Sequence, residues 1–118
     1  MNATITTTDI IAWDILANGG LTWDTTGAAP TTGYMVSIAG SEVQIPVDEF
    51  STADLDRFAE ANAPLIRAGR YFGAWVEGDT VFLDISANVA ERAEAVAMGY
   101  AEEQLAIFDV AAGEVVYM

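Results

Sequence analysis

The stretch from residue 71 to residue 110 limits the fold most, because its apolar side chains follow more than one period. Residues 71–76 and 80–85 alternate between two sets of side chains, which is the pattern of β-strands. Gly78-Asp79 between them is typical of a tight hairpin turn, because glycine accepts the backbone angles that such turns need. The stretch therefore predicts an antiparallel pair of strands.

A helix and a further hairpin are predicted after this pair. Asn88 has a side chain typical of a helix cap, and residues 89–103 place apolar and acidic side chains on opposite faces of a helix. Residues 105–110 and 114–118 alternate again around Ala112-Gly113, which predicts a final hairpin.

The earlier part of the chain shows the same order of elements. Residues 34–38 and 43–47 predict a hairpin turned at Gly40-Ser41. Ser51 is the predicted cap of a helix over residues 52–68, with an acidic side chain at the capping-box position and an expected kink or restart at Pro64. The two units together predict a repeated ββα arrangement.

These elements predict one domain, residues 1–118, of the α+β class. A first helix, capped by Thr7 or Thr8, precedes the order ββα-ββα-ββ. We expect a mainly antiparallel sheet of five or six strands with two helices packed on one face. Residues 24–33 are expected to be a connecting loop.

The composition argues against several kinds of chemistry. The 118 residues contain no cysteine, histidine or lysine. Their absence removes the thiolate nucleophile, the most frequent general base and metal ligand, and the amine of Schiff-base enzymes. We therefore expect no enzyme, cofactor or metal site. Asp84 and Asp109 would form a carboxylate pair if their strands were adjacent, but strand carboxylates more often bind backbone groups or an arginine such as Arg70.

The charge limits the partners. Four arginines and 18 acidic residues give a formal net charge of −14. Nucleic acids and anionic membranes would be repelled, whereas basic protein surfaces would be attracted. The N-terminal residues lack the charged and apolar regions of a signal peptide, and no apolar run approaches the ~20 residues that span a bilayer. We therefore expect a cytoplasmic protein with a basic protein partner.

Acidic side chains are predicted to form a face that binds this partner. The helix after Asn88 carries several of them opposite its apolar stripe, and the helix after Ser51 carries others. The predicted set is Glu91, Glu94, Glu102, Glu103, Asp56 and Glu60.

Aromatic side chains predict an alternative binding face on the sheet. They alternate with the apolar residues that face the helices, so they belong to the other side of the sheet. The predicted set is Trp23, Tyr71, Trp75, Phe82 and Phe108. We expect the first helix, with Ile11, Trp13 and Ile15, to cover this side. The alternative is a side left open for a partner or for a second copy in a homodimer.

Four segments carry a resemblance to other sequences: ANGGLTWD, PTTGYMVS, GAWVEGDTVFLDIS and QLAIFDVAAGEVV. The chain resembles small uncharacterised acidic proteins of actinobacteria and of their phages or mobile elements. That group has no known activity. The resemblance implies a setting in which host-takeover and anti-defence proteins are expected.

The sequence thus favours a non-enzymatic protein-interaction factor of a phage or mobile element. It would present an acidic face to a basic host partner, in the manner of a nucleic-acid mimic. Two alternatives use the aromatic side of the sheet instead. One is a small-molecule or peptide-binding module, and the other is a structural or virion subunit.

Overall fold

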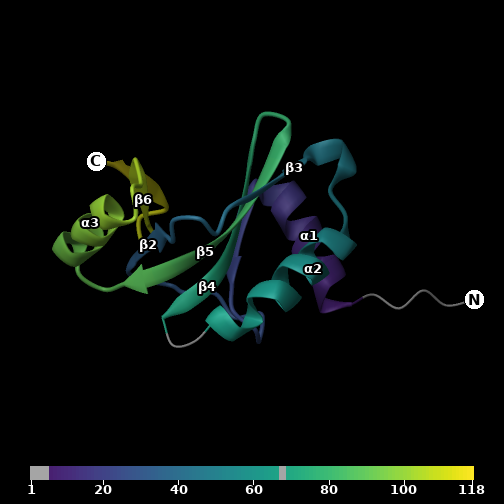
Figure 1. Ribbon diagram of the computed structural model, residues 1–118, viewed down its shortest axis with the longest axis horizontal. Helices are drawn as coiled ribbons and strands as arrows, with labels where there is room; N and C mark the ends of the chain where they lie inside the picture. Colours follow the sequence, from purple (N-terminus) through teal and green to yellow (C-terminus); the bar gives the residue numbers. More distant parts are fainter. Residues whose placement is uncertain (1–5, 67–68) are drawn as a thin grey trace, which may run out of the picture.

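The structure is a computed structural model that describes residues 6–66 and 69–118. Within these residues one seven-stranded sheet carries three α-helices (Figure 1). In chain order the elements are α1 Thr7–Asn18, β1 Gly20–Trp23, β2 Tyr34–Ser37, β3 Val43–Pro46, α2 Thr52–Asn62, β4 Arg70–Glu77, β5 Thr80–Val89, α3 Arg92–Ala101, β6 Ala106–Asp109 and β7 Glu114–Tyr117. Every strand pair is antiparallel, which confirms the predicted α+β class.

The β4–β5 hairpin forms the centre of the sheet. The two strands pair along the whole of β4, and Gly78 turns the chain with φ +58°. β1 pairs with the other edge of β4, β2 pairs with the other edge of β5, and β6 and β7 follow beyond β2. Both hairpins predicted in the second half of the chain, β4–β5 and β6–β7, are confirmed.

β2 and β3 do not form the predicted hairpin with each other. Both pair with β5, β2 with its last part and β3 with its first part. Residues 38–42 form a bulge rather than a reversal. The Ser41 hydroxyl fixes this bulge, because it donates to the carbonyl of Ile38 (2.7 Å) and accepts from the N–H of Ile85 (3.0 Å). Residues 34–46 are therefore one interrupted strand along β5.

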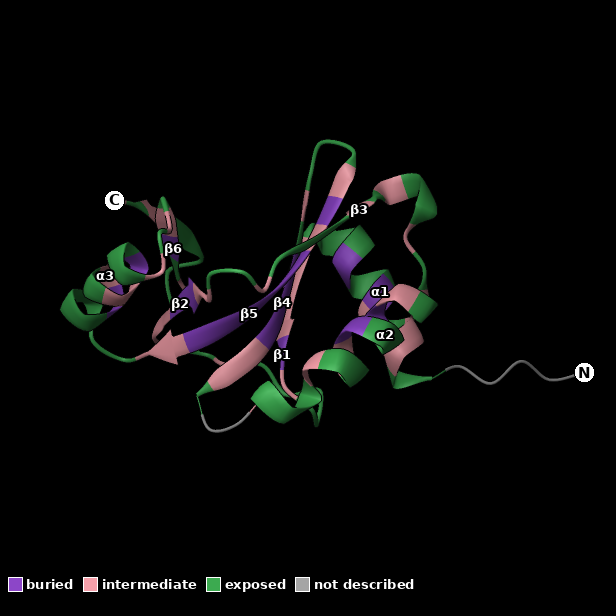
Figure 2. Ribbon diagram, viewed as in Figure 1, coloured by how far each residue is buried: buried purple, intermediate pink, exposed green. Residues whose placement is uncertain are grey.

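All three helices cover the same face of the sheet. α1 and α2 pack over β1, β4 and part of β5, and α3 packs over β2 and β6 at the other end of β5 (Figures 1 and 2). Cross-strand partners point to the same side of a sheet. Val36 under α3 lies opposite Ala87, and Phe72 under α2 lies opposite Ile85, two residues before Ala87 on the same face. Two helices on one face are thus confirmed.

The predicted position of the first helix is wrong. α1 lies beside α2 and does not cover the other side of the sheet. Ile15 of α1 is fully buried in the core shared with α2, and the Thr52 hydroxyl of α2 donates to the Asp9 carboxylate of α1 at 2.9 Å. These contacts join α1 to the α2 side of the sheet.

Capping boxes start the first two helices. Thr6, just before the predicted caps, is the N-cap of α1, and it exchanges hydrogen bonds with Asp9. Ser51 and Asp54 form the corresponding box at α2, as predicted. Each box pairs two backbone N–H groups that would otherwise lack a partner.

α2 is shorter than the predicted helix over residues 52–68. It ends at Asn62, and a 3-10 turn at Ala63–Leu65 follows, because Pro64 cannot donate the hydrogen bond that would continue the helix. Residues 67 and 68 of the predicted helix lie outside the described residues.

α3 begins later than predicted. Asn88 lies in β5, and Glu91 takes the N-cap position without a side-chain hydrogen bond. The Asn88 amide donates instead to the carbonyl of Thr32 (2.8 Å), which fixes the loop from β1 to β2 against the end of β5. Gly33 in this loop has φ +83°, and a Cβ there would meet the Asn88 Oδ1 atom at 2.6 Å. Residues 24–33 thus connect β1 to β2.

Candidate partner-binding surface

The side of the sheet opposite the helices carries no helix in the described part of the chain. We name this side the open face, and the pairing register assigns side chains to it. Its apolar and aromatic members are Met35, Tyr71, Trp75, Phe82, Ala106, Phe108, Val115 and Tyr117. Among the strand positions on this face, only Glu77 and Asp84 carry a charge.

A pair of stacked rings, one exposed and one half-buried, dominates one end of the open face. The ring centroids of Trp75 and Phe82 lie 4.4 Å apart with an interplanar angle of 15°, and Trp75 is 41% exposed. Tyr71 lies farther along β4, and Phe108 lies on β6 beyond Met35. Four of the five predicted aromatic residues are therefore on this face.

Trp23 is the exception, and its predicted placement is wrong. Trp23 lies opposite Phe72 in the register and is buried with it on the helix side, with ring centroids 5.6 Å apart. The register of β1 places Thr22, and not Trp23, on the open face.

Asp84 lies at the middle of the open face and is almost fully buried. Its carboxylate accepts hydrogen bonds from the hydroxyls of Ser37 (2.6 Å) and Ser86 (3.4 Å). Gly73 lies opposite on β4, where a Cβ would collide with the Asp84 Oδ1 atom. Burial raises the pKa of the Asp84 carboxyl, the two serine hydroxyls oppose this, and the charge of Glu42 adds to it.

Asp84 and Asp109 do not form the carboxylate pair considered above. β2 lies between β5 and β6, and Asp109 belongs to the helix side of the sheet. The Asp109 carboxylate accepts the N–H of Ala112 (3.1 Å) in the β6–β7 turn. The ion pair found within the described residues joins Arg57 and Asp54, so Arg70 does not pair with either strand carboxylate.

The acidic residues predicted to bind a partner do not form one face. Asp56 and Glu60 are exposed on α2, whereas the others flank α3 at the opposite end of the sheet (Figure 1). Glu91 and Glu94 lie at the start of α3 and are exposed. The carboxylates thus surround the sheet at separate places.

Glu102 and Glu103 occupy locally unfavourable positions. They follow the last turn of α3, where the carbonyl ends carry partial negative charge and no basic residue is present. Glu103 is exposed and has φ +58°, in the left-handed region that favours glycine, while Glu102 is half-buried. The N–H of Gln104 donates to the carbonyl of Gly99 (2.8 Å) and closes this turn. Residues that break local rules are candidates for a function.

α1 presents a second apolar surface that sequence reasoning missed. Ile10, Trp13 and Leu16 are 49%, 55% and 48% exposed, while Ala12 and Ile15 face the core. Their three-residue spacing places them along the outer side of the helix. The signal was hidden because the apolar residues of α1 are spread around the helix and do not gather in one stripe.

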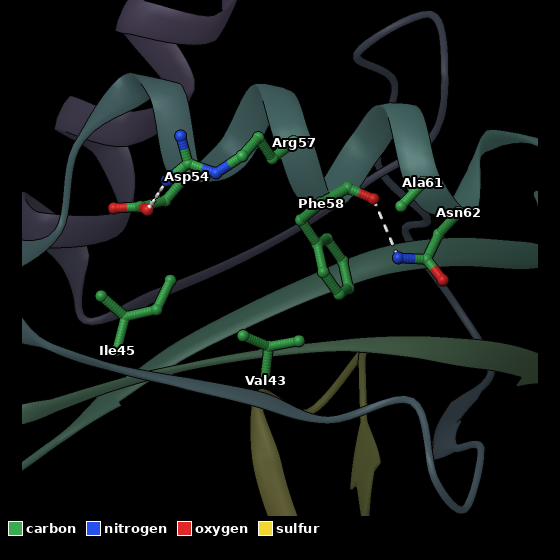
Figure 3. A pocket seen from close by; sticks show the side chains of 7 residues that line it. All are labelled: Val43, Ile45, Asp54, Arg57, Phe58, Ala61 and Asn62. Atoms are coloured by element: carbon green, nitrogen blue, oxygen red, sulfur yellow. Dashed lines mark hydrogen bonds and ion pairs between the residues drawn. The ribbon is translucent and has the colours of Figure 1, made fainter.

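A hollow of about 300 Å³ lies between β3 and α2 (Figure 3). Its lining residues are Val43, Ile45, Asp54, Arg57, Phe58, Ala61 and Asn62. The Phe58 ring points into the hollow towards the apolar side chains of β3. The polar groups at its rim bind each other, as the Arg57–Asp54 ion pair, or bind the backbone, as Asn62 does at the Phe58 carbonyl (2.9 Å). The polar side chains at this rim thus already have partners within the chain.

Metal-site geometry, helix length and similarity to known proteins do not assign a function to the chain. Within residues 6–66 and 69–118 no cluster of three or more acidic, histidine or cysteine side chains is placed to hold a metal ion. The helices of the same residues are all too short or too polar to cross a membrane. No protein family, curated protein or solved structure shows a significant match to the chain.

Proposed function

We propose that the chain is a non-enzymatic interaction factor that binds a basic protein partner through the open face. The observation that supports this most is an aromatic sheet face with few charges in a chain of net charge −14. Aromatic side chains at a charge-depleted surface are typical of the centres of protein interfaces.

The carboxylates around the sheet supply long-range attraction. Those on α2 and at the ends of α3 are mostly exposed, and they favour encounters with a basic surface. Such surfaces are common on proteins that bind nucleic acids, so the chain would compete with nucleic acid for its partner. The resemblance to phage and mobile-element proteins supports a role as an accessory or anti-defence factor.

Two matched tryptophan variants test this proposal in affinity capture from an actinobacterial lysate. Trp75→Ser removes an exposed ring from the open face, and Trp13→Ser removes a comparably exposed ring from α1 on the other side of the sheet. We expect the wild type and Trp13→Ser to retain the same basic protein at low salt, and Trp75→Ser to lose it. Higher salt should weaken the capture, because salt screens exposed charges.

Three outcomes would contradict the proposal. Equal capture by Trp75→Ser and the wild type would show that the open face does not bind the partner. A dimer in sedimentation that Trp75→Ser dissociates would assign the face to a second copy, as in the homodimer alternative. A hydrolase or transferase activity that Asp84→Asn abolishes in a folded protein would remove the non-enzymatic assignment.

A further inference from the structure

The open face contains a buried charge that lacks a compensating cation within the described residues. Asp84 is 7% exposed, and its hydrogen-bond donors are the neutral hydroxyls of Ser37 and Ser86. The two hydroxyls use part of the hydrogen-bonding capacity of the carboxylate, but they do not neutralise its charge, and a buried charge is costly unless it is paired. The charge that acts on Asp84 is that of Glu42, which has the same sign.

The surroundings of Asp84 have the composition of a site for a planar cation. The Asp84 carboxylate lies against Gly73 of β4, where a Cβ would collide with Oδ1. The Trp75–Phe82 stack borders the carboxylate at one end, and Tyr71 lies at the diagonal position at the other end. A carboxylate flanked by aromatic rings offers both a charge-assisted hydrogen bond and ring faces to a cation.

We propose that Asp84 is the anchor for a guanidinium group, namely that of an arginine side chain of the partner. A guanidinium is planar, donates two parallel hydrogen bonds to a carboxylate and stacks on aromatic rings. An ammonium group acts as a point charge and does not make the same paired contact. The inference rests on the proposed function, because the arginine belongs to a protein bound on the open face. The guanidinium site itself can be measured without that protein.

Nα-acetyl-arginine amide is the probe for the first experiment. It is titrated into ¹⁵N-labelled protein, and the backbone amide shifts of Gly73, Asp84 and Ser86 are followed. We expect saturable shifts that Asp84→Asn weakens by at least about tenfold in affinity, as for loss of one member of a buried charge pair. Asp79→Asn removes the same charge from the exposed turn of the same hairpin, and it should change the affinity by less than about twofold.

The lysine derivative separates guanidinium recognition from general attraction to an acidic protein. Nα-acetyl-lysine amide should bind clearly more weakly than the arginine derivative, because it lacks the planar, paired donors. Equal affinity of the two derivatives, or equal arginine binding by Asp84→Asn and the wild type, would overturn the proposal. Either result would assign Asp84 a structural role, in which its carboxylate holds Ser37 of β2 and Ser86 of β5.

A measurement on the wild type alone covers the case in which Asp84→Asn does not fold. Guanidinium chloride at non-denaturing concentration should displace the arginine derivative more strongly than sodium chloride at equal ionic strength, and equal displacement would overturn the proposal. Partner capture tests the Asp84 anchor separately from the proposed function of the open face. If Trp75→Ser loses the partner while folded Asp84→Asn retains it at the wild-type level, the anchor is refuted and the proposed function stands.

Discussion

Replacing Glu103 by glycine should make the protein more stable. At φ +58° a residue with a Cβ costs roughly 1–2 kcal/mol relative to the right-handed region, because the Cβ approaches the next carbonyl oxygen. Glycine avoids this cost, but its greater conformational freedom in the unfolded chain lowers the free energy of unfolding by roughly 0.5–1 kcal/mol. Removing a carboxylate from the negative end of α3 adds roughly 0.3–1 kcal/mol. The sum is a gain of about 1 kcal/mol.

Urea denaturation of two variants separates these contributions. Glu103→Gln removes the charge and keeps the Cβ, so it should gain only about 0.5 kcal/mol. Glu103→Gly should gain more, with a melting temperature higher by about 4 °C for a chain of this size. If Glu103→Gly is no more stable than Glu103→Gln, the strain of the left-handed conformation does not exceed the entropic cost of glycine, and the reasoning fails. If Glu103 also serves the partner, the more stable variant should bind that partner less tightly at low salt.

Replacing Glu91, Glu94 and Glu102 together by glutamine should leave the melting temperature nearly unchanged, because dipole contributions of a few tenths of a kcal/mol have opposite signs at the two ends of α3. Partner affinity at low salt should fall, and unchanged affinity would show that these carboxylates are only solvated. Phe58→Ala should cost about 3 kcal/mol in urea denaturation, because a buried ring is lost. A cost below about 1 kcal/mol would show that the hollow beside α2 collapses to fill the space. Asp84→Asn should stabilise the protein most at pH values above the folded pKa of this carboxyl, which burial raises above its ordinary value of 3.8. As the pH falls through the folded pKa towards 3.8, the wild type binds the proton more tightly when folded, so the advantage measured by denaturation should shrink.

Local signals explain which elements could be predicted from the sequence. The β4–β5 hairpin joins two alternating runs by a glycine turn, and the capping box at Ser51 is a pattern of neighbouring residues. The β2–β3 hairpin failed because Gly40-Ser41 gives the same local signal as a turn, while its outcome depends on a distant strand. β5 is long enough to pair with both segments, and the Ser41 hydroxyl bonds to it. The local sequence does not distinguish a bulge from a hairpin at this position, because the contacts with β5 decide between the two.

The residues of the candidate site also divide into those placed by local sequence signals and those placed by contacts between distant strands. Strand alternation alone placed Trp75 and Phe82 on one side of the sheet, and the structure confirms this. The same alternation places Asp84 there, but Ser37 reaches it from β2, and no local signal showed that β2 pairs with β5. Asn88 illustrates a further limit, because an amide that suits a helix cap also suits a bond to the backbone of a loop.

The position of α1 connects the fold to the proposed function. Gly19, with φ +80°, ends α1, and β1 begins at the next residue, so the helix folds back beside β1 on the side where α2 also packs. This arrangement leaves apolar side chains exposed on both sides of the molecule, with Trp13 on α1 and Trp75 on the open face. If α1 had packed on the open face, the apolar side chains of α1 and those of the open face would have covered each other. Burial of apolar surface stabilises by about 25 cal/mol per Å². Binding of a partner that covers either of these exposed surfaces is therefore favoured by the apolar area that it buries. The open face also carries a buried carboxylate flanked by aromatic rings, and this is the chemistry that we propose selects an arginine-bearing partner.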